Sequence, residues 1–221
     1  IRDRFINKGD ESFRAGVDIQ PADIFAHVAA GGALCSTAAV PVGVFHDRFA
    51  ELAKEYDAVF HVNIGSGFSA SHQNAVLAAE NLPNVYVIDS RNLSTGQGHV
   101  VLEACRLAKT ATDPEEMYRQ LNAFAPTVDA SFLLDYMVKG GRCSSVVALG
   151  ANLLRLKPCI EVVDNKMIVG KKYRGSYVKC MEHYVRDRLE NCDDLLYDTI
   201  FITHTPVPQE ILDTVHRTVR E

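Results

Sequence analysis

The residues best suited to chemistry form a glycine- and serine-rich stretch, residues 63–74, with the sequence NIGSGFSASHQN. It follows the apolar run 58–62, which is typical of a buried strand, and precedes residues 75–79, which are typical of a helix. A loop that opens into a helix collects backbone N–H groups and hydroxyls, and these can bind an oxyanion. A simpler interpretation stays open: Ser69 or Ser71 caps the helix, and the glycines only permit the turn.

Two further polar segments follow apolar runs. Ser36 and Thr37 are adjacent hydroxyl residues, and residues 89–98 form a second polar stretch with glycines. Ligands of open α/β sheets bind beyond the carboxyl ends of the strands, so these positions suit a ligand site. The sequence has no G-x-G-x-x-G, G-x-x-x-x-G-K-[ST] or G-x-S-x-G pattern, which argues against a nucleotide loop or a hydrolase elbow.

Histidines and arginines are the other candidates. His61 lies in the expected strand, where a core or edge role is the more frequent one, and the histidines lack metal-ligand spacing, so we expect no metal. Arg142 and Arg174 are flanked by glycine and can close over a carboxylate or phosphate, although surface arginines near turns are the simpler interpretation. An enzyme acting on a phosphorylated or acyl substrate through Ser66, His72 and Arg142 is therefore an alternative hypothesis.

The composition is that of an ordinary globular protein, with 47% hydrophobic and 23% charged residues. A formal net charge of −5 gives no general attraction to nucleic acid, so we expect no nucleic-acid partner. No uninterrupted apolar run is long enough to form a transmembrane segment. The six cysteines contain no C-x-x-C pair, which favours reduced thiols in a cytoplasmic protein, with Cys105 and Cys159 acting as small hydrophobic residues.

The order of elements predicts an α/β protein with two lobes. Strands alternate with helices up to Phe124, which favours a parallel layered sheet in a first lobe, residues 1–124. A hairpin turning at Asp164 and Asn165 then predicts an α+β second lobe, residues 125–221, with antiparallel strands. The expected strands are residues 58–62, 85–88, 127–134, 159–163, 166–169 and 199–203. The expected helices begin at Pro21, near Phe45, after the loop 63–74, near Val101, after Thr112, at Ser144, at Ser176 and at Pro208.

Taken together, the polar segments resemble those of the DegV family of fatty-acid-binding proteins. The matching residues are 65–71 with 73–75, 87–90 with 96–98, 139–142, 156–158 and 174–175. They occur in the family's order, and the resemblance extends from Asp18 to about Leu189. An ordered series of this kind is far more specific than any one of its members.

This resemblance implies a long-chain fatty acid in a narrow tunnel between the lobes and no other cofactor. It further implies that the protein is a carrier and not an enzyme. Such a carrier presents the acyl carboxylate to a separate fatty acid kinase for phospholipid synthesis. Carried over by motif, the carboxylate ligands are Thr37, Ser66, Gly67 and Ser69. Contacts with the ligand head or the kinase are implied for Ser36, Arg142 and Arg174.

The sequence departs from the family pattern in three places. A segment of threonine, serine, glutamine and proline is replaced by residues 35–40, CSTAAV. The family's opening strand and its closing histidine-glycine-proline-glycine segment are missing, so we expect the second lobe to be incomplete at its C-terminal end. A ligand-free regulator or scaffold is therefore a third hypothesis.

Overall fold

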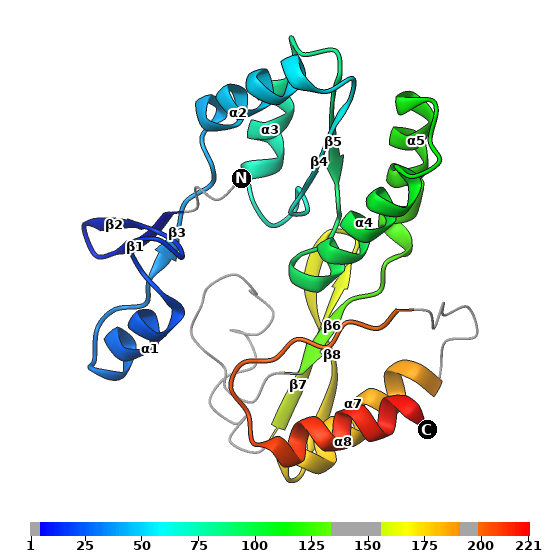
Figure 1. The fold of residues 1–221 in the computed structure, drawn as a ribbon. Helices are drawn as coiled ribbons and strands as arrows, with labels where there is room; N and C mark the ends of the chain where they lie inside the picture. The colour runs from blue at the N-terminus through cyan, green and yellow to red at the C-terminus, as the bar shows by residue number, and fades with distance from the viewer. Residues whose placement is uncertain (1–4, 134–155, 191–198) are drawn as a thin grey trace. The chain divides into compact units, whose positions relative to one another are not determined.

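The computed structural model describes residues 5–133, 156–190 and 199–221, in two compact units, Ile1–Val128 and Asp129–Glu221. The elements of the first unit are β1 (Phe5–Lys8), β2 (Glu11–Arg14), α1 (Pro21–Ala29), β3 (Ser36–Thr37), α2 (Val42–Glu55), β4 (Val59–Asn63), α3 (Ser71–Ala79), β5 (Val85–Asp89), α4 (Ser94–Leu107), α5 (Pro114–Phe124) and a 3-10 turn (Ala125–Thr127) (Figure 1). Those of the second unit are β6 (Ser131–Leu133), β7 (Leu156–Val163), β8 (Lys166–Arg174), α7 (Tyr177–Glu190) and α8 (Gln209–Arg220).

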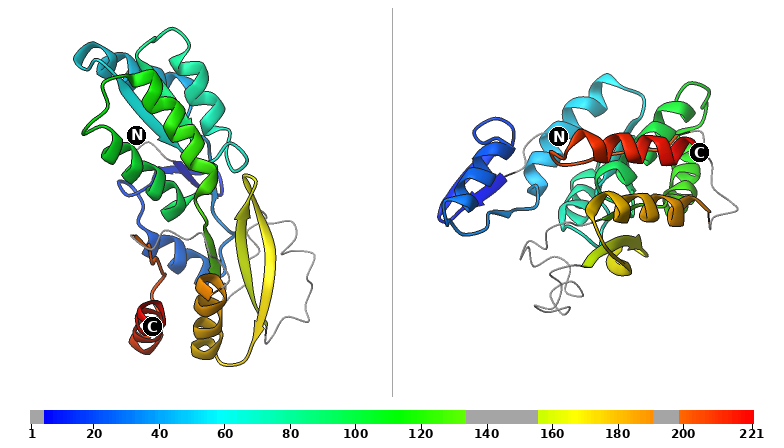
Figure 2. Two further views of the ribbon diagram at one scale, coloured as in Figure 1. Left: turned by 90° about the vertical axis from the view of Figure 1, so that its right-hand side faces the viewer. Right: turned by 90° about the horizontal axis from the view of Figure 1, so that it is seen from below.

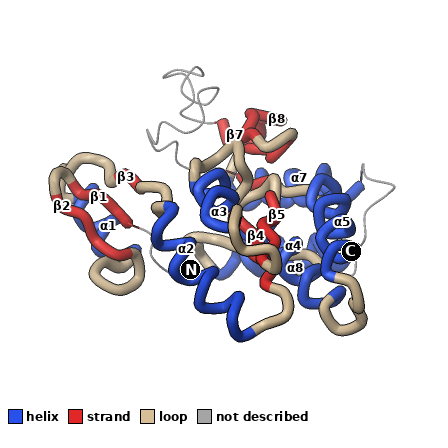
Figure 3. The backbone as a smooth tube through the Cα atoms, turned by 90° about the horizontal axis from the view of Figure 1, so that it is seen from above, coloured by secondary structure: helices blue, strands red, loops and turns tan. Residues whose placement is uncertain are grey.

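The first unit is built around the parallel pair β4 and β5. Helices α2 and α3 cover one face of this pair and α4 and α5 cover the other (Figure 1), and Figure 3 shows the same strands lying among these helices. Alternate residues of β5 enter two cores: Val85 and Val87 pack with α2 and α3, whereas Tyr86 and Ile88 pack with α4 and α5. This layered parallel arrangement confirms the predicted architecture.

Local sequence signals explain where these helices form. Phe45 and Phe49 lie one turn apart on α2 and are almost fully buried, as their spacing predicts. At the start of α5 the Asp113 carboxylate accepts a hydrogen bond from the Glu115 N–H at 3.0 Å, and Pro114 occupies the first helical turn.

A small antiparallel sheet with the order β2-β1-β3 precedes this layered core. Its third strand is the predicted hydroxyl pair, with Ser36 opposite Asn7 and Thr37 opposite Ile6. The helix predicted from Pro21 forms as α1, yet none of its residues is buried.

The second unit contains an antiparallel sheet with the order β6-β7-β8, and α7 packs against its hairpin (Figure 2). The turn between β7 and β8 lies at Asp164 and Asn165, whose φ angles are 47° and 63°. This left-handed pair is typical of a two-residue hairpin turn and confirms the predicted hairpin. The sequence predicts a helix from Ser144 to Leu156, which lies almost wholly outside the described residues; its predicted last residue, Leu156, is instead the first residue of β7.

Two of the predicted strands were wrong in position or type. Residues 199–203 form no strand. Their sequence is rich in β-branched residues, but a strand also needs a partner strand, and these residues do not join the β6-β7-β8 sheet. The strand expected over 127–134 is shorter, because residues up to Thr127 form a 3-10 turn and β6 begins at Ser131. The structure divides its units after Val128, four residues beyond the sequence-based boundary.

The second glycine-bearing loop was also predicted too long. Helix α4 begins at Ser94, so Gly96 and Gly98 lie in its first turns, and Gly96 is buried. The neighbouring Gln97 side chain donates to the Val62 carbonyl of β4 at 3.1 Å. Glycine has no side chain and so suits this close packing of helix and strand. A prediction based on composition mistakes such a glycine-bearing helix start for a loop.

Candidate functional site

The glycine-serine loop leaves the carboxyl end of β4 beside the loop that leaves β5. Asn63 and Asp89 are paired as the last residues of these strands, and the Gly65 N–H donates to the Asn92 carbonyl at 2.7 Å. Ser66 then binds the Asp89 carboxylate twice, through its N–H at 3.1 Å and its hydroxyl at 2.6 Å. The two loops are therefore joined, as expected for neighbouring parallel strands.

The Ser66 side chain is engaged with Asp89 rather than left open towards a ligand. A hydroxyl has one hydrogen, and the Ser66 hydrogen is directed at Asp89, so this side chain orients the loop in the present structure. The next residue, Gly67, is exposed, and Ser69 is half-buried. The role of Asp89 as the acceptor was missed, although its position at the end of a strand was a usable signal.

Ser69 and Ser71 form a linked pair at the start of α3. The Ser71 N–H donates to the Ser69 oxygen at 3.1 Å, and the Ser69 hydroxyl donates to the Ser71 oxygen at 3.0 Å. Ser69 thus accepts from the N–H of the first residue of α3, while the N-cap position itself is held by Ala70 and has no side-chain cap. Its hydroxyl hydrogen can rotate about the Cβ–Oγ bond and be redirected to an anion.

The Ser36–Thr37 segment is connected to the same helix through Val40. The Val40 N–H donates to the Ser71 hydroxyl oxygen at 3.1 Å, and the Asn74 amide donates to the Val40 carbonyl at 2.8 Å. Three residues of extended chain span roughly 10 Å at most, so Thr37 lies near this attachment. Both Ser36 and Thr37 are exposed. Sequence reasoning missed Ser71 and Asn74 as connecting residues, because their partner is a backbone.

His61 supports the loop from within the core. Its ring contacts Phe45 and Phe49 with centroid distances of 5.3 and 5.2 Å, and its Nε2 lies 2.9 Å from the Asn63 amide nitrogen. That amide also donates to the Ser71 carbonyl at 3.3 Å. Burial lowers the pKa of His61 to about 4, so the imidazole is neutral at pH 7 and can accept from Asn63. The predicted core role of His61 agrees with this placement.

Neither predicted arginine belongs to the first unit, which contains this loop. Arg142 lies outside the described residues, and Arg174 is the exposed last residue of β8 in the second unit. Across residues 5–133, 156–190 and 199–221, no three His, Cys, Asp or Glu side chains are grouped so that they can hold a metal ion. None of the helices in these ranges is long and apolar enough to cross a bilayer.

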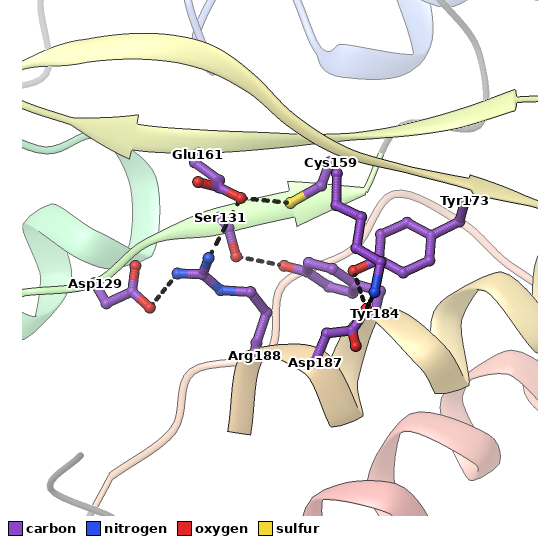
Figure 4. Close-up of polar contacts among 9 residues, drawn as sticks. Asp129, Ser131, Cys159, Glu161, Tyr173, Tyr184, Asp187 and Arg188 are labelled. Atoms are coloured by element: carbon purple, nitrogen blue, oxygen red, sulfur yellow. Dashed lines mark hydrogen bonds and ion pairs between the residues drawn. The ribbon is translucent and has the colours of Figure 1, made fainter. Parts of the chain in front are cut away.

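A separate polar cluster joins β6, β7 and β8 to α7 (Figure 4). The Arg188 guanidinium pairs with Asp129 and lies 3.4 Å from a Glu161 oxygen, while the Ser131 and Tyr184 hydroxyls are 2.8 Å apart. No candidate ligand residue from the sequence belongs to this cluster. Its contacts bind the start of the second unit to its helix, and we interpret it as structural.

The buried thiol of this cluster differs from an exposed one in the first unit. Burial and the nearby Glu161 carboxylate raise the pKa of Cys159 to about 12. Cys105 was expected to act as a small hydrophobic residue as well, but it is exposed on α4. Its neighbour Ala104 faces the core instead, since consecutive residues on a helix point in different directions.

Comparison with known proteins decides the family. The family model described as "Uncharacterised protein, DegV family" matches residues 5–221. The chain belongs to the DegV family. A DegV domain-containing protein of Caldanaerobacter subterraneus subsp. tengcongensis is 29% identical over 97% of this chain and 78% of its own length. Protein DegV of Bacillus subtilis is 32% identical over 72% of this chain, and the match spans only 59% of that relative.

The fold agrees with solved members of the family. A structure of a DegV family protein from Thermus thermophilus, described by its fatty acid binding, superposes with a TM-score of 0.74 at 25% identity. It covers 86% of this chain and 69% of that protein. The mixed α/β fold of the described residues, with its parallel pair and two antiparallel sheets, therefore matches the fold of a DegV protein described by its fatty acid binding.

The lowered pKa of His61 predicts acid-sensitive stability. An unfolded histidine binds its proton near pH 6.5 and His61 in the folded chain only near pH 4, so the unfolded state binds more protons between these values. The free energy of unfolding of the first unit is expected to fall by about 3 kcal/mol as pH drops through this window. Urea titrations between pH 7 and 4 measure it. His61→Phe should lose this dependence and the exposed His46→Gln should keep it; equal slopes for all three proteins would contradict the assignment.

The two thiol environments predict a difference in reactivity. In native protein at pH 8, iodoacetamide should modify Cys105 quickly and leave the buried Cys159 and Cys180 unmodified, because only an accessible thiolate attacks. Peptide mass spectrometry follows the label, and the same reaction in guanidinium chloride is the control that exposes every thiol. Labelling of native Cys159 as fast as Cys105 would show that the described packing is wrong.

Proposed function

We propose that this chain binds a long-chain fatty acid and holds its carboxylate between the Ser36–Thr37 segment and the glycine-serine loop. The observation that carries the proposal is the attachment of both segments to the start of α3, through Val40 and Ser71. Membership of the DegV family and the likeness to the Thermus thermophilus protein support the choice of ligand.

The proposed donors are the Thr37 hydroxyl, the Gly67 N–H and the Ser69 hydroxyl. Neutral donors suffice, because a carboxylate that accepts several hydrogen bonds stays ionised even when partly buried. The Ser66 hydroxyl can donate to the ligand only if it rotates away from the Asp89 carboxylate, so we assign Ser66 first to orienting the loop. Ser36, Arg142 and Arg174 are proposed as secondary contacts with the ligand head or a protein partner.

The acyl chain supplies most of the affinity in this proposal. Burial of a methylene contributes about 0.8 kcal/mol, so a C16 chain offers on the order of 10 kcal/mol before the costs of ordering it. The hydrogen bonds then set the orientation of the acid. Such a division of roles suits a protein that must hold a lipid with its head accessible.

We further propose that the protein is a cytoplasmic carrier and not an enzyme, and that it presents the carboxylate to a separate fatty acid kinase. The acyl phosphate made by that kinase would enter phospholipid synthesis. The proposed carboxylate donors are amides and alcohols, which orient an acid without activating it. Phosphoryl transfer from ATP to the acid is thus assigned to the partner.

Purified protein is expected to release long-chain fatty acid on organic extraction, and mass spectrometry of the extract identifies it. Thr37→Ala combined with Ser69→Ala should weaken retention of [1-14C]palmitate at least about tenfold, since each lost bond to a charged group costs about 1.5–3 kcal/mol. Ser12→Ala with Thr110→Ala removes two exposed hydroxyls of the same unit and serves as the matched control.

Two results would count against the binding proposal. Folded protein that takes up no fatty acid even when it is offered would reject the ligand class. Undiminished retention by the Thr37 and Ser69 double variant would reject these anchors while leaving the ligand class in place.

The carrier role makes a separate prediction. A fatty acid kinase with ATP should form acyl phosphate, trapped as the hydroxamate, only when this protein is added loaded with fatty acid. The loaded protein with ATP alone should form none. Turnover of an acyl or phosphorylated substrate by the isolated chain would support the enzyme hypothesis instead.

A further inference from the structure

The backbone of Val40 is held by two side chains of one helix. Ser71 and Asn74 lie one turn apart on α3, and they bind the Val40 N–H at 3.1 Å and the Val40 carbonyl at 2.8 Å. Both polar groups of this residue are therefore paired with side chains. Residues 38–41 belong to no helix or strand, so the Ser71 and Asn74 side chains supply the hydrogen bonds that a neighbouring strand would supply in a sheet.

The position of Val40 makes this pairing necessary. The residue is 7% exposed and packs in the core cluster with Phe45, Phe49 and Ala75. A buried backbone N–H or carbonyl without a partner is costly, so the segment can enter the core only where α3 supplies partners. Beyond Val40 the chain enters α2, and α2 packs side by side with α3 (Figure 1, Figure 3).

Ser71 also contacts the other half of the proposed site. Its hydroxyl oxygen is 3.0 Å from that of Ser69, and its N–H donates to Ser69. On the opposite side, its carbonyl accepts from the Asn63 amide, which is itself within 2.9 Å of the His61 ring. Ser71 is 8% exposed and thus joins the strand end, the glycine-serine loop and the Val40 segment.

We propose that Ser71 and Asn74 are positioning residues of the carboxylate site, which rests on the proposed function above. They set the place of Thr37 relative to Ser69 by holding the Val40 backbone, and neither touches the fatty acid. Ser71 has the additional role of accepting the Ser69 hydrogen while no ligand is bound. Helix α3 thereby aligns two donor segments that are remote in sequence.

This role differs from a general contribution to stability. A residue that only stabilises the fold lowers the melting temperature and changes ligand affinity equally whether or not Thr37 is present. A residue that positions Thr37 loses its effect on affinity once Thr37 has lost its hydroxyl. A double-mutant cycle separates the two cases.

The experiment measures the dissociation constant for [1-14C]palmitate and the melting temperature of the full chain. Asn74→Asp keeps the shape but removes the donor to Val40, and Ser71→Ala removes the acceptor. Gln73→Ala, an exposed neighbour on the same helix, is the matched control. Ser71→Thr keeps a hydroxyl and tests for rescue, and each of the first two changes is repeated in the Thr37→Ala background.

We expect Asn74→Asp and Ser71→Ala to weaken palmitate binding at least threefold. Gln73→Ala and Ser71→Thr should bind like the wild type. In the Thr37→Ala background, Asn74→Asp should cause no further loss of affinity. The inference would be overturned if Asn74→Asp and Ser71→Ala both bind palmitate as tightly as the wild type, or if their losses add to that of Thr37→Ala. In either case the proposed function stands as long as the unmodified protein binds palmitate. If Ser71→Ala does not fold, the Asn74→Asp cycle alone decides. Failure of the wild type itself to bind would reject the proposed function, and the inference with it.

Discussion

Buried backbone groups must find hydrogen-bond partners, and at Val40 this requirement joins parts of the chain that are 31 residues apart. The segment leaving β3 reaches the core without regular structure, and α3 pairs its N–H and carbonyl through Ser71 and Asn74. The glycine-serine loop ends at the same helix. The chain beyond the Ser36–Thr37 segment and the end of the glycine-serine loop are thus attached to one helix by a packing constraint, before any ligand is considered.

The chemistry at this place is that of neutral donors. Hydroxyls and amides surround the loop, while the nearby Asp89 carboxylate already accepts hydrogen bonds from Ser66 and from the Arg91 N–H. His61 beneath the loop is neutral at pH 7, so it adds no charge. An environment of this kind orients a carboxylate and leaves it unactivated, which is the physical basis for proposing a carrier.

Periodicity and turn chemistry allowed most elements to be predicted. The apolar run from Val85 to Ile88, the helix start after Thr112 and the hairpin turn at Asp164 and Asn165 are local signals, and the structure agrees with each. Residues 199–203 failed because strand formation depends on a partner strand, which no local pattern reveals. Within the candidate site, motif order singled out the hydroxyl residues, whereas the contacts of Ser66, Ser71 and Asn74 depend on tertiary neighbours that no motif shows.

The central claim is that hydroxyls and amides hold the ligand head as an ionised carboxylate. NMR of protein loaded with [1-13C]palmitate tests it directly, because the carboxyl chemical shift reports ionisation. We expect one bound signal that stays at its ionised value to below about pH 4, and that begins to titrate at higher pH when Ser69 is changed to alanine. A bound carboxyl that titrates like the unbound acid, unaffected by Ser69→Ala, would contradict it.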